Sequence, residues 1–214
     1  ELQRLGKELS ASDMMSDDEG SQIQQLKIIL SSVTLAQRPL TVEQLDLILE
    51  ALLGEEVLNL EDDLRKVYSS LFSLRMPEDD DEDELDGSTV VTLRHSSFYE
   101  FFESPSIDTG SIEINRDQAG ADFLFVMLYA LANFEAPSSN RWLGPLKRYA
   151  KRYLPLHLKL ADPAKVAPGR RNDISSFLAD LFTNESLLNA WMIDSIYRRF
   201  LSSLNYHPST VVSD

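Results

Sequence analysis

The chain of 214 residues contains no cysteine. This absence excludes disulfide bonds, thiol catalysis and cysteine-rich zinc sites. The chain also lacks any uncharged apolar run of the ~18–20 residues that a membrane-spanning helix needs. Its first eight residues lack the apolar core of a signal peptide. We therefore expect an intracellular, cytoplasmic protein.

Basic residues are scarce, with 20 Lys and Arg against 35 Asp and Glu and a net charge of −15. This balance argues against general nucleic-acid binding, because contacts to phosphates need Lys and Arg. The eight glycines are scattered, and the Gly-x-x-x-x-Gly-Lys-Ser/Thr loop that binds nucleotide phosphates is absent. Hydrophobic residues make up 43%, as in ordinary folded proteins. The chain begins at Glu1 rather than at a methionine, so we expect it to be a fragment.

Apolar residues at helical spacing predict three helices in the first third of the chain. The first runs from about 22 to 36 and is broken at Pro39, whose ring cannot continue a helix. Thr41 and Gln44 have the spacing of a capping box, which predicts the start of a second helix. Gly54 is expected to stop that helix. A third helix is predicted over 60–71. Its inward residues are expected to be Leu64, Val67, Tyr68, Leu71 and Phe72.

A β-hairpin is predicted next, with strands at 73–76 and 90–94. The connection contains an acidic run at 78–86. This run lacks the spacing of an EF-hand calcium loop, so we expect a solvated loop rather than a metal site. Three helices followed by two strands is the element order of a winged helix.

The residues after the second strand predict a sharp corner followed by a helix. Ser97 and Glu100 have the spacing of a second capping box, and Phe98, Phe101 and Phe102 form the apolar side of the helix. His95 stands between strand and helix, where a rigid corner can project its side chain. A hydrolase based on His95 and Ser97 is unsupported, because the sequence has no Gly-x-Ser-x-Gly elbow and no sign of an oxyanion hole.

The C-terminal half reads as a second helical unit. A connector at 104–115 precedes a helix at 119–134 that is apolar nearly all round, so we expect it to be buried centrally. An amphipathic helix at 142–158 is expected to end or kink at Pro155, before a loop at 161–171. Trp142 and Trp191 are expected in the core. Two more helices are predicted at about 173–182 and 186–204.

The amphipathic helix carries a basic stripe, defined as Lys147, Arg148, Lys151 and Arg152. These residues fall at i, i+1, i+4 and i+5, so they share one side of the helix. One interpretation is a solvated helix face. The other is a surface that docks onto an acidic neighbour, within the parent protein or in an assembly, through contacts that weaken with salt.

Three segments resemble NACHT-type signalling ATPases of the STAND class, and the fungal members in particular. The His-x-Ser-Phe-x-Glu-Phe-Phe pattern at 95–102 resembles the corner of their winged-helix domain. Residues 28–45, with the Arg-Pro-Leu-Thr break, look like the helices just after the ATPase core. Residues 143–158 are similar to the Leu-x-x-Tyr-Ala-x-x-Tyr-x-Pro-x-His-Leu segment that follows the winged helix. The resemblance covers about 23–158, and the rest is predicted from helical periodicity alone.

The resemblance and the periodicity together predict a mainly α fold with one small β-hairpin. We expect a winged-helix domain at 22–103 and a helical domain at 104–207. Residues 1–21 are expected to be a linker or the end of a preceding helix, and 208–214 a tail.

In the family the ATPase core lies upstream, so the resemblance implies that this fragment is no enzyme and holds no cofactor itself. The parent protein would bind ADP or ATP. The histidine at the winged-helix corner contacts the β-phosphate of ADP in related switches, which implies that role for His95 once the ATPase domain is present. The implied partners are the upstream ATPase domain, downstream sensor repeats of the same chain, and further copies on activation. Neither nucleic acid nor membrane is implied.

Two other functions deserve comparison with this regulatory one. A plain protein-interaction scaffold without any nucleotide linkage remains the alternative. DNA binding by a winged helix would need a basic recognition helix. The second predicted helix instead carries Glu43, Asp46 and Glu50, which argues against that function.

Overall fold

A computed structural model describes residues 18–54, 57, 59–76, 88–96, 99, 114–132, 143–189 and 191–192. The fold is mainly α, as the sequence predicts, and the predicted hairpin is part of a small three-stranded antiparallel sheet. Several predicted features lie outside the described residues. These are the acidic run at 78–86, the capping box of Ser97 and Glu100 with Phe98, Phe101 and Phe102, Trp142, the domain boundary at 103/104 and the two termini.

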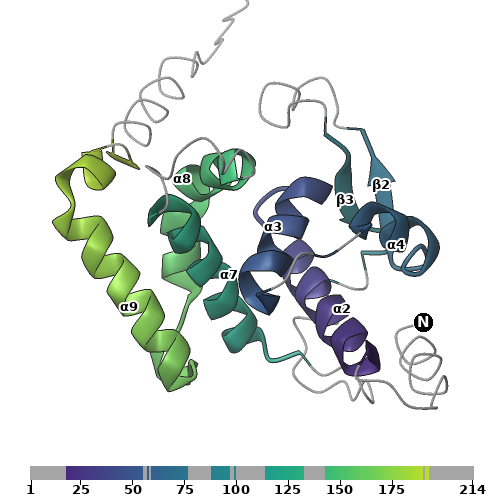
Figure 1. The fold of residues 1–214 in the computed structure, drawn as a ribbon, viewed down its shortest axis with the longest axis horizontal. Coiled ribbons are helices and arrows are strands. Elements are labelled where there is room, and N and C mark those ends of the chain that lie inside the picture. Colours follow the sequence, from purple (N-terminus) through teal and green to yellow (C-terminus); the bar gives the residue numbers. More distant parts are fainter. Residues whose placement is uncertain are drawn as a thin grey trace, which may run out of the picture.

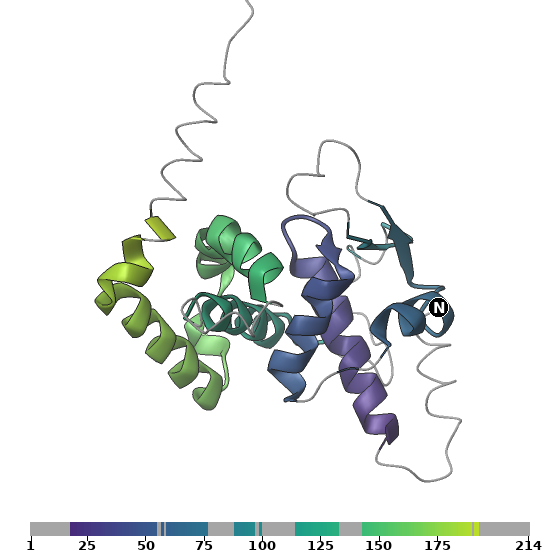
Figure 2. The same cartoon turned by 45° about the horizontal axis from the view of Figure 1, so that its top comes forward.

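The elements form a row in space. The sheet and α4 (Leu60–Lys66) lie at one end, and α9 (Pro168–Thr183) lies at the other (Figure 1, Figure 2). Between them stand α2 (Asp18–Leu35), α3 (Val42–Leu53), α7 (Arg116–Ala132) and α8 (Leu143–Leu160). A short 3-10 helix, η3 (Pro163–Lys165), connects α8 to α9.

The capping box at the start of α3 is confirmed. The backbone N–H of Gln44 donates to the Thr41 hydroxyl at 3.1 Å, and the Thr41 N–H donates to the Gln44 side-chain oxygen at 3.0 Å. Both residues are buried. At the other end, Gly54 adopts a φ of +79° and its N–H donates to Glu50 O. This left-handed conformation favours glycine, which explains why α3 ends there.

The third helix is shorter than predicted. It ends at Lys66 rather than near residue 71, because the chain then turns and the N–H groups of Leu71 and Phe72 both donate to Tyr68 O. Phe72 therefore begins a strand. Tyr68, Leu71 and Phe72 are buried, but Val67 is 46% exposed, so its predicted inward position is wrong.

The sheet has the order β1-β3-β2, with every pairing antiparallel. The predicted hairpin is present as β2 (Phe72–Arg75) and β3 (Val90–Leu93). Its partner β1 (Leu40–Thr41) was not predicted, since two residues carry no readable period. Leu40 pairs with Val91, so the segment after Pro39 is fixed to the same sheet that leads to His95.

Central burial of the fourth predicted helix is confirmed. The helix, α7, packs against α2, α3, α8 and α9, and its buried residues point to several sides. It begins at Arg116, earlier than predicted, because the Asn115 side chain accepts the N–H of Gln118 at 3.1 Å. An Asn in this position satisfies a donor that the first helical turn leaves open.

Prolines mark two features of the C-terminal half. The predicted helix at 142–158 is present as α8, and of the two effects expected of Pro155 an end of the helix is excluded, because α8 continues to Leu160. Pro155 is exposed while its neighbours Leu154 and His157 are buried, so the proline lies on the solvent side of α8, where a helix tolerates the loss of one backbone hydrogen bond most easily. The predicted loop at 161–171 instead contains η3 and the start of α9. Pro168 occupies the first turn of α9, a position that suits its fixed φ.

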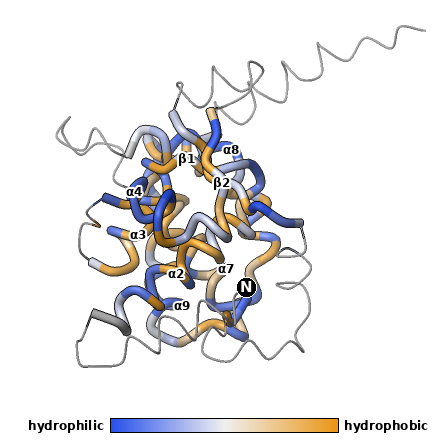
Figure 3. The backbone as a smooth tube through the Cα atoms, turned by 90° about the vertical axis from the view of Figure 1, so that its right-hand side faces the viewer, coloured by the Kyte–Doolittle hydropathy of each residue, from blue (hydrophilic) through white to orange (hydrophobic). Residues whose placement is uncertain are grey.

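One cluster of buried apolar side chains runs through both halves, from α2 to α9. Apolar stretches of α2 and α7 lie in the interior (Figure 3). Trp191, predicted in the core, is half-buried with its ring 6.5 Å from that of Phe182. None of the described helices combines the length and the apolar character needed to cross a membrane.

Candidate functional site

His95 lies at the corner that the sequence predicts, two residues beyond the end of β3, and its side chain is exposed. The preceding residue is held firmly. The N–H of Arg94 donates to Leu71 O at 2.9 Å, and its guanidinium Nε donates to Phe72 O at 3.0 Å. Leu71 immediately precedes β2 and Phe72 begins it, so the corner is anchored to the sheet. The Tyr99 N–H donates to Ser96 O at 2.9 Å and turns the chain.

The basic stripe lies on α8 as predicted, at the surface. Arg148 and Arg152 are exposed, and Lys147 and Lys151 are half-buried. Partial burial, followed by the nearby charge of Lys151, lowers the pKa of the Lys147 ammonium. The Arg152 guanidinium lies 5.3 Å from the centre of the Tyr153 ring. Lys147 and Lys151 are therefore close enough for their charges to repel each other.

Sequence reasoning missed a partly buried polar junction on the other side of α8. Its members are Gln37 and Gln44 from the α2–α3 region, and Pro145, Tyr149 and His157 from α8. The Gln37 N–H donates to the Tyr149 hydroxyl at 2.9 Å, and that oxygen lies 3.0 Å from His157 Nε2. The Gln44 amide donates to Pro145 O at 2.9 Å. The hydrogen bonds of Gln37 and Gln44 join residues 112 and 101 positions apart.

Burial sets the charge state of this junction. It lowers the pKa of His157 to about 4 and raises the pKa of the Tyr149 hydroxyl. His157 is therefore neutral near pH 7. Since the Tyr149 oxygen accepts from Gln37, its own hydrogen is available to donate to the neutral His157 Nε2.

Aromatic rings complete the junction. The ring of Phe123 in α7 lies edge-on to Tyr149 at 5.8 Å and 4.9 Å from the His157 ring. The Arg38 guanidinium lies 5.7 Å from the centre of the Tyr149 ring. The Arg38–Pro39 break between α2 and α3, read in the sequence only as a helix break, therefore docks on α8. The sequence offered one signal for this junction. Tyr149, Tyr153 and His157 fall at i, i+4 and i+8, which places them on one side of a helix.

A second polar contact links α9 to α7. Arg170 Nε donates to Asp122 Oδ1 at 2.7 Å, and the guanidinium lies 3.9 Å from the centre of the Phe125 ring. Gln118 donates to the same Oδ1 atom at 3.0 Å. Both ion-pair partners are less than a third exposed, which makes this pair more significant than the exposed pairs of α4.

The predicted residues thus occupy two separate elements. His95 follows β3, and the basic stripe belongs to α8. Among the described residues, no group of three His, Asp or Glu side chains is placed to hold a metal ion. The chain matches no known family model, and no curated protein or solved structure was found to be significantly similar.

Proposed function

We propose that this chain is the regulatory arm of a NACHT-type, nucleotide-switched signalling ATPase. In this role the winged-helix part closes over ADP held by an upstream ATPase domain, and His95 donates to its phosphate. The chain itself is not an enzyme and holds no cofactor. The exposed position of His95 on an anchored corner carries the proposal. A side chain that serves a ligand on another domain has to be accessible and pre-positioned.

The polar junction supports the relay half of the proposal. Rigid-body motion of the winged-helix part can pass to α8 because Gln37 and Gln44 are hydrogen-bonded to it. The α2–α3 break is also tied to β3 through β1. A displacement at the His95 corner is therefore connected through the sheet to α8 by ordered contacts. Such a relay needs the physical contacts to exist, and their coupling is what experiment has to measure.

The remaining parts of the proposal follow from the resemblance of the three sequence segments to NACHT-type signalling ATPases. The partners would be the upstream ATPase domain and downstream sensor repeats, with self-association on activation, in a cytoplasmic signalling protein of the innate-immunity type. The basic stripe would dock on an acidic surface of the parent protein or of a second copy.

The decisive experiment follows ADP release from the longer protein that includes the ATPase domain. Stopped-flow release of fluorescent ADP is compared for the wild type and His95→Ala at fixed salt. A charge-assisted hydrogen bond contributes about 1.5–3 kcal/mol, so release should accelerate at least roughly tenfold. Ser96→Ala is the matched control, because Ser96 is the exposed neighbour at the same corner.

An unchanged release rate in His95→Ala, with an unchanged circular dichroism spectrum, would reject the nucleotide contact. The second candidate would then stand, a protein-interaction scaffold without nucleotide linkage. The specific observation that favours this candidate is the compact basic stripe on a strongly acidic chain.

A further inference from the structure

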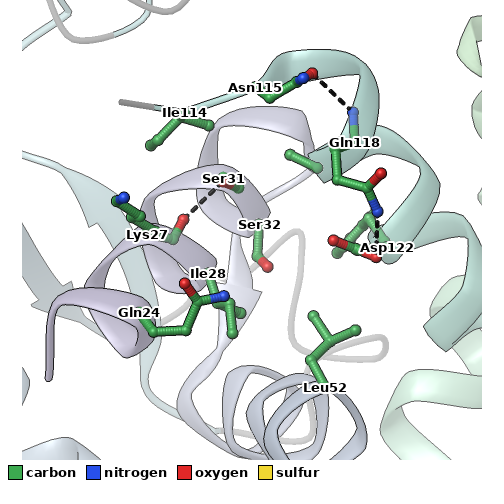
Figure 4. A pocket seen from close by; sticks show the side chains of 12 residues that line it. Gln24, Lys27, Ile28, Ser31, Ser32, Leu52, Ile114, Asn115, Gln118 and Asp122 are labelled. Atoms are coloured by element: carbon green, nitrogen blue, oxygen red, sulfur yellow. Dashed lines mark hydrogen bonds between the residues drawn. The ribbon is translucent and has the colours of Figure 1, made fainter. Parts of the chain in front are cut away.

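A cavity of about 120 Å³ opens where α2 and the end of α3 meet the start of α7. Its position is notable because these helices come from the two predicted domains. One wall is formed by Gln24, Lys27, Ile28, Ser31 and Ser32 from α2, and the facing wall comes from residues 114–123 (Figure 4). Leu52 closes one side. Pockets for drug-sized ligands begin at roughly 300 Å³, so only a small molecule fits here.

Ser32 supplies a buried polar group that faces this cavity. It is 3% exposed, and its hydroxyl points into the space between α2 and α7 (Figure 4). The neighbouring hydroxyls behave differently. Ser31 and Thr34 each donate to the carbonyl four residues earlier, at 2.6 Å. Within the described part of the chain, the Ser32 hydroxyl has no hydrogen-bond partner. The hydroxyl oxygen is therefore available to a small molecule that enters the cavity.

Asp122 supplies the charge opposite Ser32. Its Oδ1 atom accepts hydrogen bonds from Gln118 and Arg170. Its Oδ2 atom is turned toward the cavity (Figure 4). Arg170 of α9 donates to Oδ1, and its positive charge reduces the net attraction of the carboxylate for a cation. Lys27 lines the cavity on the α2 side, away from Asp122.

We propose that this cavity binds a small primary ammonium compound with a short apolar chain. The ammonium group donates to Asp122 Oδ2 and to the Ser32 oxygen, and the apolar chain lies against Ile28, Leu52 and Phe123. An apolar cavity of ~150 Å³ holds a benzene molecule, so about six non-hydrogen atoms fit. The ligand would bridge α2 and α7, which makes it an effector of how the two halves pack. This inference does not depend on nucleotide binding.

The test uses n-butylammonium chloride as the probe on the whole 214-residue chain, followed by two-dimensional amide NMR. We expect saturable shifts at the amides around Ser32 and Asp122, and a rise in thermal midpoint with ligand concentration. Sodium butyrate, of equal size and opposite charge, should bind at least tenfold more weakly. Equal binding of butyrate, or the absence of saturable shifts on α2 and α7, would overturn the proposal.

Variants with matched controls locate the contacts. Asp122→Asn should raise the Kd at least tenfold, as expected for loss of a charge-assisted hydrogen bond. Asp173→Asn is the control, since Asp173 lies 3.6 Å from the same Arg170 and does not line the cavity. Ser32→Ala should raise the Kd a few-fold, whereas Ser31→Ala should not, because the Ser31 hydroxyl is already engaged by Lys27 O. Equal effects of Asp122→Asn and Asp173→Asn would refute the site, and the serine pair decides the question if Asp122→Asn fails to fold.

A second titration, with valine, distinguishes a free amino acid from a simple amine as the source of the ammonium group. Tighter binding of valine than of n-butylammonium would mean that Lys27 contacts the carboxylate and that a free amino acid is the ligand. Weaker binding would favour a simple amine. Either result supports an ammonium site, provided that Asp122→Asn weakens the binding of the tighter ligand.

Discussion

The two halves of the described structure are held together by different chemistry. From α2 to β3 the core is almost wholly aliphatic, and Leu26, Ile29, Leu45, Ile48 and Leu49 are all completely buried. From α7 to α9 aliphatic residues such as Leu128 and Leu154 are buried too, but aromatic rings and polar pairs, such as Tyr149 with His157, are added to them. Aliphatic packing tolerates changes of pH and salt, whereas a buried polar pair requires defined geometry and a fixed protonation state. The second half is thus the part of the molecule that is sensitive to its conditions.

The contrast is sharpest between α3 and α9. Five residues of α3 are buried, namely Gln44, Leu45, Leu47, Ile48 and Leu49, but only Leu181 is buried in the longer α9. Helix α9 is attached chiefly through Arg170 and half-buried side chains such as Phe177, whose ring lies 5.6 Å from that of Phe125. It therefore contributes less to global stability than its length suggests.

The largest expected effect comes from the aliphatic half. Leu45→Ala should lower the free energy of unfolding by about 2–5 kcal/mol, because it removes a fully buried side chain and leaves a cavity. The matched change Leu160→Ala, at a leucine that is 64% exposed, should alter it by no more than ~0.5 kcal/mol. Urea denaturation followed by circular dichroism measures both. Similar losses in the two variants would mean that the aliphatic cluster is not where stability is concentrated.

This contrast also explains what the sequence could predict. Periodicity identified α2, α3 and α7, because aliphatic residues recur at helical spacing there, and the Thr41–Gln44 box marked the start of α3. It failed at β1, which is only two residues long, and at the predicted loop over 161–171, which contains η3 and the start of α9. The site followed the same rule. The corner position of His95 was readable, but the junction of Gln37, Tyr149 and His157 was not, since it depends on tertiary contacts across about a hundred residues.

The next expected effect is a pH dependence that originates in the polar half. Burial lowers the folded-state pKa of His157 to about 4 from an ordinary 6.5. Between these values the unfolded chain takes up a proton that the folded chain does not, so stability falls as the pH decreases from 6.5 to 4. The loss attributable to this residue is on the order of 3 kcal/mol at pH 4. Urea denaturation at several pH values measures this loss. Comparing the wild type with His157→Gln separates the contribution of His157 from that of the carboxylates. Parallel pH profiles for the two proteins would show that His157 does not titrate in this way.

A smaller loss is expected when the junction loses one oxygen atom. Tyr149→Phe keeps the ring packing against Phe123 but leaves Gln37 N–H and His157 Nε2 without their shared partner. An unsatisfied buried polar group costs about 1–3 kcal/mol. Tyr153→Phe is the control on the same side of α8, because Tyr153 is only half-buried. Chemical denaturation should separate the two variants, and an equal, negligible loss in both would mean that the hydroxyl does not hold the two halves together.

The smallest of these effects tests the buried capping box of the aliphatic half. Thr41→Ala removes the side-chain oxygen that accepts from Gln44 N–H, and the loss of such a cap costs typically about 1 kcal/mol. Thr34→Ala is the matched control, since the Thr34 hydroxyl only donates back to its own helix, to Leu30 O, and alanine favours helix there. Thermal unfolding of the two variants and the wild type should give a clearly lower midpoint temperature for Thr41→Ala than for the other two proteins. If both variants unfold at the same temperature, the buried box is dispensable, and α3 is held in place by its leucine and isoleucine side chains alone.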